Sequence, residues 1–181
     1  MIYEELVMEL DALFPDDFEA VSEEERRELR SMNLPKWLMR LYNKHNPRST
    51  LAIGRFRLLP LKELIDLNVW DEFGETLYQL GLSIVGVAED GNVYCLNMTE
   101  ENKIAGNDVL LADHDADYTG MDFKKARAAM KFQASSLEEL LTKEIGFCKK
   151  ARPASAGIQP PKVKKTRREA TSRKHKRASA E

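Results

Sequence analysis

SIVGVAEDGNVYCLNM, residues 83–98, predicts a β-hairpin at the centre of this protein. Two apolar runs flank Glu89-Asp90-Gly91-Asn92, and an Asp-Gly pair tolerates the positive φ angles that a tight turn requires. A sheet is therefore expected to form the middle of the fold.

Further strands are expected on both sides of this hairpin. Residues 51–59, LAIGRFRLL, alternate arginines with apolar side chains, which is the period-two pattern of one half-buried strand. Another strand is expected over residues 109–112, after a polar turn at 100–107. These segments predict an antiparallel sheet with short connections.

Helices are expected before and after the strands, because apolar residues recur there at helical spacing. Ser22 with Glu25 forms one capping box, and Ser136 with Glu139 forms a second, whose helix should end at Gly146. The expected helices cover residues 3–14, 23–31, 35–45, 122–132 and 137–145, and a further short helix is expected to begin at Leu61 after Pro60. Helices that cluster rather than alternate with strands predict an α+β fold, in which helices pack against an antiparallel sheet.

The charge of the chain is divided between two regions. Residues 149–181 hold 12 Lys and Arg against 2 Glu, a net charge of +10, and since the whole chain carries −2, residues 1–148 carry −12. Apolar residues are concentrated in the first 147 positions. We therefore expect one globular domain over residues 1–148, followed by a basic, disordered tail over 149–181.

Cysteine usage and the N-terminus indicate the compartment. Cys95 and Cys148 show neither CxxC spacing nor a dense disulfide framework. The first residues, MIYEELVMELDALF, carry acidic side chains where a secretory signal needs a basic start, and no run of 18 apolar residues occurs. A cytoplasmic chain without a membrane partner is expected.

The densest group of potential metal ligands is Asp113-His114-Asp115-Ala116-Asp117. A catalytic metal needs several converging ligands and an open position for water, and the other histidines are His45 and His175. Asp113, His114, Asp115 and Asp117 are therefore expected to have a structural role or to contact a partner. A metal-dependent hydrolase is the weaker alternative.

Other catalytic patterns are missing from the sequence. Gly81, Gly86 and Gly91 do not lead into a helix N-terminus, as the glycines of a phosphate-binding loop do, and no G-x-S-x-G motif occurs. We therefore expect a protein that is not an enzyme and holds no cofactor or metal.

Several aromatic side chains are candidates for either the core or a partner-binding surface. For Trp37 and Trp70 the core is the preferred interpretation, and a partner-binding groove is the alternative. The apolar helical pattern that begins at Trp70 is expected to break near Gly74. Tyr94 and Asn97 point to opposite faces of their strand, so one of them is expected to face water or a partner.

Four short motifs follow one another along the chain: LPKWL at 34–38, LLPLKEL at 58–64, DHD at 113–115 and SSLEELL at 135–141. Together with the hairpin, their order resembles the SMI1/KNR4 (SUKH) family over residues 34–141, so residues 1–33 and the tail lie outside the resemblance. The resemblance implies a SUKH-like fold and a non-enzymatic binding domain, often an immunity protein that neutralises a toxin. Where the family has an Asn-Gly-Gly turn, this chain has Asn46-Pro47-Arg48-Ser49.

Two functions are compatible with these features. The preferred hypothesis is an immunity protein whose acidic domain binds a basic toxin such as a nuclease, with Trp37 and residues 113–117 as candidate contacts. The alternative is a scaffold or regulatory domain tethered to nucleic acid by its tail, without sequence readout, unless the tail only solubilises the chain. The candidate nucleic-acid contacts are Lys162, Lys164, Lys165, Arg167, Arg168, Arg173, Lys174, Lys176 and Arg177.

Overall fold

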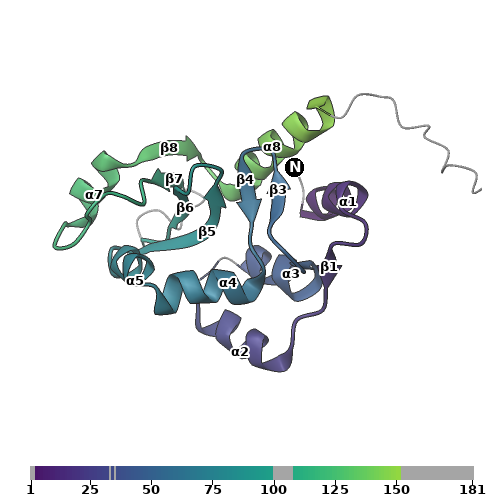
Figure 1. The fold of residues 1–181 in the computed structure, drawn as a ribbon, viewed down its shortest axis with the longest axis horizontal. Helices are drawn as coiled ribbons and strands as arrows, with labels where there is room; N and C mark the ends of the chain where they lie inside the picture. Colours follow the sequence, from purple (N-terminus) through teal and green to yellow (C-terminus); the bar gives the residue numbers. More distant parts are fainter. Residues whose placement is uncertain (1–2, 33, 35, 100–107, 152–181) are drawn as a thin grey trace, which may run out of the picture.

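The computed structural model describes residues 3–32, 34, 36–99 and 108–151 (Figure 1). The expected turn at 100–107, Pro35 and the tail from residue 152 lie outside the described residues. The helices are α1 (Tyr3–Leu13), α2 (Glu23–Ser31), α3 (Lys36–Lys44), α4 (Leu61–Ile65), the π-helical turn η1 (Asp66–Trp70), α5 (Glu72–Gln79), α7 (Phe123–Ala129) and α8 (Leu137–Ala151). The strands are β1 (Phe18–Glu19), β2 (Asn46–Pro47), β3 (Leu51–Ile53), β4 (Phe56–Leu58), β5 (Leu82–Ala88), β6 (Val93–Asn97), β7 (Val109–Ala112) and β8 (Lys131–Ala134).

A six-stranded antiparallel sheet forms the centre, with its strands in sequence order from β3 to β8. The predicted α+β class, with helices packed on an antiparallel sheet, is confirmed. The predicted hairpin is also confirmed, because β5 pairs with β6 and Gly91 in the turn has a φ of 89°. A small second sheet pairs β1 with β2, and Asn46-Pro47 forms its second strand.

Both faces of the central sheet are covered. One core contains buried residues of α1, α2, α3, α4 and α8, whereas the other contains buried residues of α5, α7 and the segment before α7. Side chains of β6 alternate between the two cores, so Tyr94 faces the first and Cys95 the second. Tyr94 and Asn97 are only 4% and 3% exposed, so the expectation that one of them faces water is wrong, while a partner contact of one of them stays a prediction.

The predicted single strand over 51–59 is in fact a second hairpin. β3 and β4 pair with each other, and a turn at Gly54-Arg55 separates them. Gly54 adopts a φ of 60°, a conformation that glycine tolerates without a steric penalty. The alternating pattern identified the strand residues correctly but did not locate this turn.

Two helices end at positions other than those predicted. α7 is capped by Asp122 as expected, but it ends at Ala129, and Phe132 lies in β8, paired with Leu110. α8 continues through Gly146 to Ala151, three residues past the expected domain boundary at 148. Packing against α1 supports this extension, because Lys149 Nζ lies 2.6 Å from Glu9 Oε1 (Figure 1).

The first capping box is confirmed, and the second is altered. The Ser22 hydroxyl accepts from the Glu25 N–H, while the Glu25 carboxylate accepts from the Ser22 N–H. Ser136 caps α8 by accepting from the Glu139 N–H, but the Glu139 carboxylate accepts from Ser135 rather than from Ser136. Within the described part of the chain, no helix has both the length and the apolar character needed to cross a bilayer.

Candidate functional site

Asp113, His114 and Asp115 follow β7 directly and form one exposed group. Their potential ligand atoms all lie within 4.8 Å of one another, which makes this the one three-residue group in the described ranges that could hold a metal. The structure thus brings together three of the four residues singled out in this segment.

The hairpin turn between β5 and β6 holds this group in place. Asn92 Oδ1 accepts from the His114 N–H at 3.3 Å, and the Asn92 amide donates to Asp90 Oδ2 at 3.0 Å. The His114 ring packs against Gly91, where a Cβ would lie 3.3 Å from ring carbon Cε1. We call the resulting cluster of four exposed carboxylates the acidic rim; its members are Glu89, Asp90, Asp113 and Asp115.

The other side of this loop is anchored on α5. The Asp113 N–H donates to the Tyr118 hydroxyl at 3.2 Å, and the Asp115 N–H donates to Asp113 Oδ1 at 3.0 Å. Tyr118 is buried, which raises the pKa of its phenol, and its ring packs edge-on against Phe73 of α5 with the centroids 5.8 Å apart. These contacts fix the loop backbone at Asp113 and Asp115, and they hold the Asp113 carboxylate against the Asp115 N–H.

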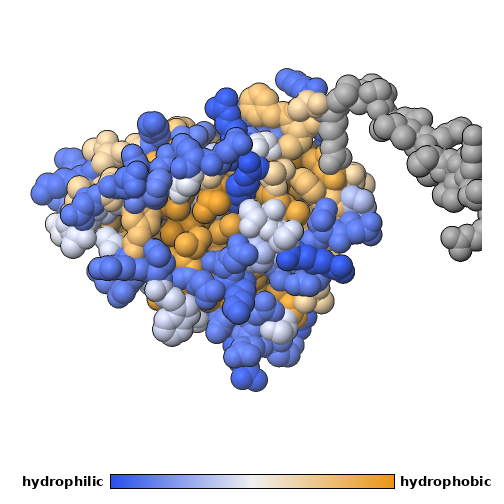
Figure 2. Space-filling view, viewed as in Figure 1, coloured by the Kyte–Doolittle hydropathy of each residue, from blue (hydrophilic) through white to orange (hydrophobic). Residues whose placement is uncertain are grey.

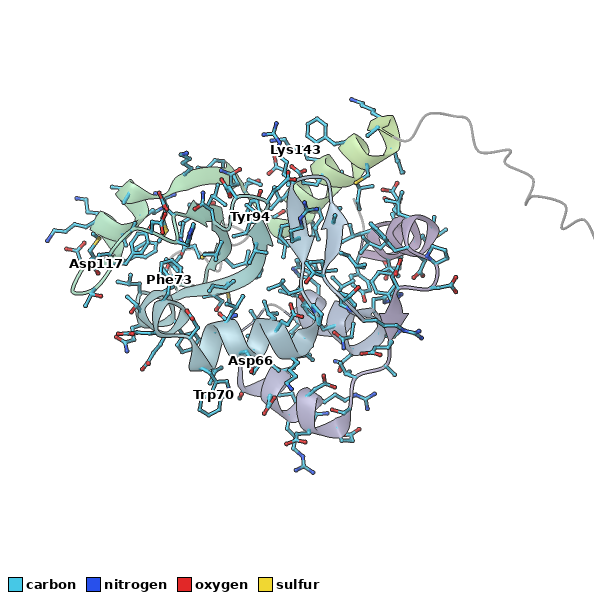
Figure 3. All side chains as sticks on the ribbon, viewed as in Figure 1. Asp66, Trp70, Phe73, Tyr94, Asp117 and Lys143 are labelled. Carbon is cyan, nitrogen blue, oxygen red and sulfur yellow. The ribbon has the colours of Figure 1, made fainter. Side chains whose placement is uncertain are left out.

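Asp117 is directed into a different cleft. This cleft of about 340 Å³ is lined by Asp71, Glu72 and Phe73 of the α5 N-terminal region as well as by Asp117 (Figure 3). The Thr119 N–H donates to Asp117 Oδ1 at 2.9 Å, which lowers the pKa of that carboxyl. The four-residue metal cluster of the hydrolase hypothesis is therefore not formed as such, since Asp117 is not part of the group at Asp113.

The two tryptophans occupy different environments. Trp37 on α3 is partly buried and packs against the first core, so the structure does not bring it to the acidic rim. Trp70 is 77% exposed, and the core interpretation is wrong for this residue (Figure 3). The reason is that Asp71 ends η1 and caps α5, which interrupts the apolar pattern expected to continue from Trp70.

A groove of about 550 Å³ opens beside the acidic rim. Glu89 and Asp90 belong to both features, and the rest of the lining comes from the β3–β4 turn, β5, β6, β7, β8 and α8. Figure 2 shows hydrophilic side chains bordering an apolar surface over β5 to β7. The sequence had singled out Tyr94, but sequence reasoning missed the groove residues Glu144 and Phe147. Glu144 gave a signal, since it interrupts the apolar face of α8 beside Leu141 and Ile145.

No protein-family model matches the chain, and no curated protein or solved structure is significantly similar to it. The candidate nucleic-acid contacts from Lys162 to Arg177 lie outside the described residues.

Proposed function

We propose that this chain is a non-enzymatic protein-binding domain of the SMI1/KNR4 (SUKH) type, an immunity protein that covers the substrate-binding surface of a basic toxin such as a nuclease. The acidic rim carries the proposal. Asp90 accepts from the Asn92 backbone and amide, and Asp113 accepts from the Asp115 N–H. The donors to Asp90 and Asp113 are neutral, so they hold these two carboxylates in place without cancelling their charge. The other two rim carboxylates have basic neighbours: Glu89 pairs with Arg57 at 3.5 Å, and His114 Nε2 lies 3.3 Å from Asp115 Oδ1.

The acidic rim affects both the rate at which a basic partner associates and the affinity of the complex. A nuclease is basic where it holds its substrate, so an acidic partner is steered toward that surface before contact. Because the hydrogen bonds already order the rim loop in the free domain, little conformational entropy remains to be lost on binding. The net charge of −12 on residues 1–148 acts in the same direction.

The test begins with capture of a partner by the full chain from lysate of its native host. The proposal requires a basic protein whose toxic activity is abolished by an equimolar amount of this chain, with no change in the mass of either protein. Failure to capture a basic protein, or a captured toxin that stays active in the complex, would show that the immunity function is wrong.

The rim itself is tested by a double variant, Asp113→Asn with Asp115→Asn. The asparagine oxygen at position 113 can still accept from the residue 115 N–H, so the loop should keep its shape. We expect a several-fold lower association rate at low salt and a nearly unchanged dissociation rate. The matched control is the double variant Glu4→Gln with Glu24→Gln, which removes the same amount of charge from exposed positions on α1 and α2. Equal association rates for the two double variants would show that the partner does not bind at the acidic rim.

A second candidate function, the scaffold tethered to nucleic acid, is supported by the +10 charge in residues 149–181. We expect the full chain to bind duplex DNA weakly and with a steep salt dependence. A chain ending at Ala151, where α8 ends, should lose this binding. Equal DNA binding by the two chains would contradict a role of the tail.

A further inference from the structure

The groove beside the acidic rim has a mouth and a floor of different character. At the mouth, the groove is lined by the exposed Arg55, Lys143, Glu89 and Asp90, and Glu89 also pairs with Arg57 at 3.5 Å. These charges are in contact with water and are screened by solvent. The residues that line the groove and are almost fully buried therefore decide which ligand it prefers.

Glu144 is the buried charge of the groove. It is 4% exposed, and its Oε2 accepts from the Arg55 N–H at 2.7 Å. A Cβ at Gly54 would overlap the same carboxylate, so the β3–β4 turn packs tightly against it. Among the described residues, Glu144 has no cation within ion-pair distance, and its Oε1 accepts no hydrogen bond. Oε1 is open to the groove rather than sealed in the core, so it can accept a hydrogen bond from a ligand there.

Tyr94 presents a second unpartnered polar group. Its ring packs against Phe56 with the centroids 5.2 Å apart, and the residue is 4% exposed while lining the groove (Figure 3). Its hydroxyl makes no hydrogen bond to another described residue, and it is open to the groove rather than sealed in the core. Burial and, secondly, the Glu144 charge raise the pKa of Tyr94, so the phenol stays protonated and neutral at physiological pH. The floor therefore offers one negative charge and one hydroxyl.

Phe147 supplies an apolar wall. It lies one turn beyond Lys143 on α8, lines the groove and is 49% exposed. An aromatic face beside a carboxylate is a suitable environment for a planar, weakly hydrated cation. A guanidinium carries five N–H donors, enough to reach Oε1 of Glu144 and the Tyr94 oxygen together, whereas an ammonium acts as a compact, strongly hydrated charge.

We propose that this groove receives the side chain of an arginine from the protein partner, with its guanidinium paired to Glu144 and stacked on Phe147. This inference rests on the proposed function, because it names the anchor that a basic partner would insert beside the rim. Insertion would give Glu144 the counter-charge that it lacks in the free domain.

The groove is tested first without any partner, by NMR titration of the ¹⁵N-labelled full chain with N-acetyl-arginine N-methylamide. We expect saturable shifts for the backbone amides of Tyr94 and Glu144. The corresponding blocked lysine should bind several-fold more weakly, and blocked citrulline, which has a similar shape but no charge, should not bind. Equal shifts with citrulline, or shifts confined to Asp113 and Asp115, would overturn the inference.

Variants then identify the groups responsible. Glu144→Gln should weaken arginine binding by at least about tenfold, because it removes the charge but keeps an oxygen for the Arg55 N–H. Phe147→Ala changes an exposed side chain and should weaken binding several-fold even if Glu144→Gln folds poorly. Glu24→Gln on α2 is the control of equal charge change and should bind like the unmodified chain. If both single variants fold and still bind the blocked arginine as tightly as the unmodified chain, the proposed arginine site is refuted.

The two proposals fail in different ways. If a basic partner binds but Glu144→Gln leaves its dissociation rate unchanged, the arginine anchor is wrong and the immunity function stands. If the blocked arginine binds in the groove but no basic protein binds the chain, the proposed function is wrong and the groove is a site for small guanidinium compounds rather than a partner anchor.

Discussion

Replacing Gly74 by alanine tests the close packing of α5 against η1. Gly74 lies inside α5, and in an isolated helix this change would be stabilising by about 0.5–1 kcal/mol. In the folded chain, a Cβ at position 74 would overlap the Leu67 carbonyl oxygen and lie 2.8 Å from the Leu67 carbonyl carbon. Both are backbone atoms, so the conflict is relieved only if η1 moves relative to α5.

The magnitude follows from these opposing effects. Overpacking of a well-packed region costs about 1–3 kcal/mol, and a clash with backbone belongs at the upper end. Subtracting the helix-propensity gain leaves a net destabilisation of about 2 kcal/mol. For a chain of 181 residues this lowers the melting temperature by about 4–8 °C.

The matched control is Gly146→Ala, the same substitution within α8. Nothing lies within 4 Å of a Cβ at position 146, so alanine should raise the melting temperature by about 1–4 °C. Thermal unfolding of both variants in the full chain, followed by calorimetry or circular dichroism, measures the difference. A Gly74→Ala protein that melts at or above the temperature of the unmodified chain would refute the close packing of η1 on α5.

Three further predictions follow from burial and capping. Trp70 is exposed, so Trp70→Phe should remove most of the fluorescence that acrylamide quenches and shift the emission to shorter wavelength. Trp37 is partly buried, so Trp37→Phe should leave the quenchable fluorescence in place. The opposite result would contradict the exposures of the two tryptophans. Cys148 should react with a thiol reagent in the native protein. Cys95 is buried, and burial raises the pKa of its thiol, so it should react only when the protein unfolds. Fast labelling of both cysteines would contradict the burial of Cys95. The Lys125 N–H holds the pKa of Asp122 below its ordinary value, so the capping contribution of Asp122 is present at neutral pH and is lost as the pH falls through that lowered pKa. In an NMR titration the Asp122 carboxyl should therefore protonate at lower pH than a free aspartate, and titration at the pH of a free aspartate would contradict the cap.

Much of the fold could be predicted because its signals are local. The Asp90-Gly91 turn and the Ser22–Glu25 capping box depend on residues within four positions of one another, and both form as expected. The order of helices and strands was sufficient for the α+β class.

The errors concern elements that depend on distant contacts. β8 shows little apolar alternation and exists because it pairs with β7, so the sequence pattern places its first two residues, Lys131 and Phe132, at the end of a helix. The turn at Gly54 is supported by α8, through the Glu144 carboxylate on the Arg55 N–H. A pattern within one short segment contains no information about such partners.

In the candidate site, too, residues close in sequence could be predicted to lie together, whereas residues brought together by folding could not. Asp113, His114 and Asp115 are contiguous, so the sequence itself placed them together. Asp90 joins them only through Asn92, which requires the β6–β7 pairing to bring the two loops side by side. The burial of Glu144 next to Tyr94 depends on α8 packing against the β3–β4 turn and the central sheet, so it could not be predicted from any one of these elements.

The acidic rim and the groove should control different steps of binding, and this separates their contributions. Rim carboxylates are exposed and act over distances limited by a Debye length of about 8 Å at physiological ionic strength, so they set the association rate and lose influence as salt is added. Glu144 is buried, and an arginine paired with it is shielded from water and ions, so its loss should appear in the dissociation rate and persist at high salt. With a basic partner in hand, we therefore expect Asp113→Asn with Asp115→Asn to slow association at low salt only, and Glu144→Gln to speed dissociation at every salt concentration. A dissociation rate of Glu144→Gln that returns to normal in high salt would mean that Glu144 acts as one more surface charge rather than as a buried anchor.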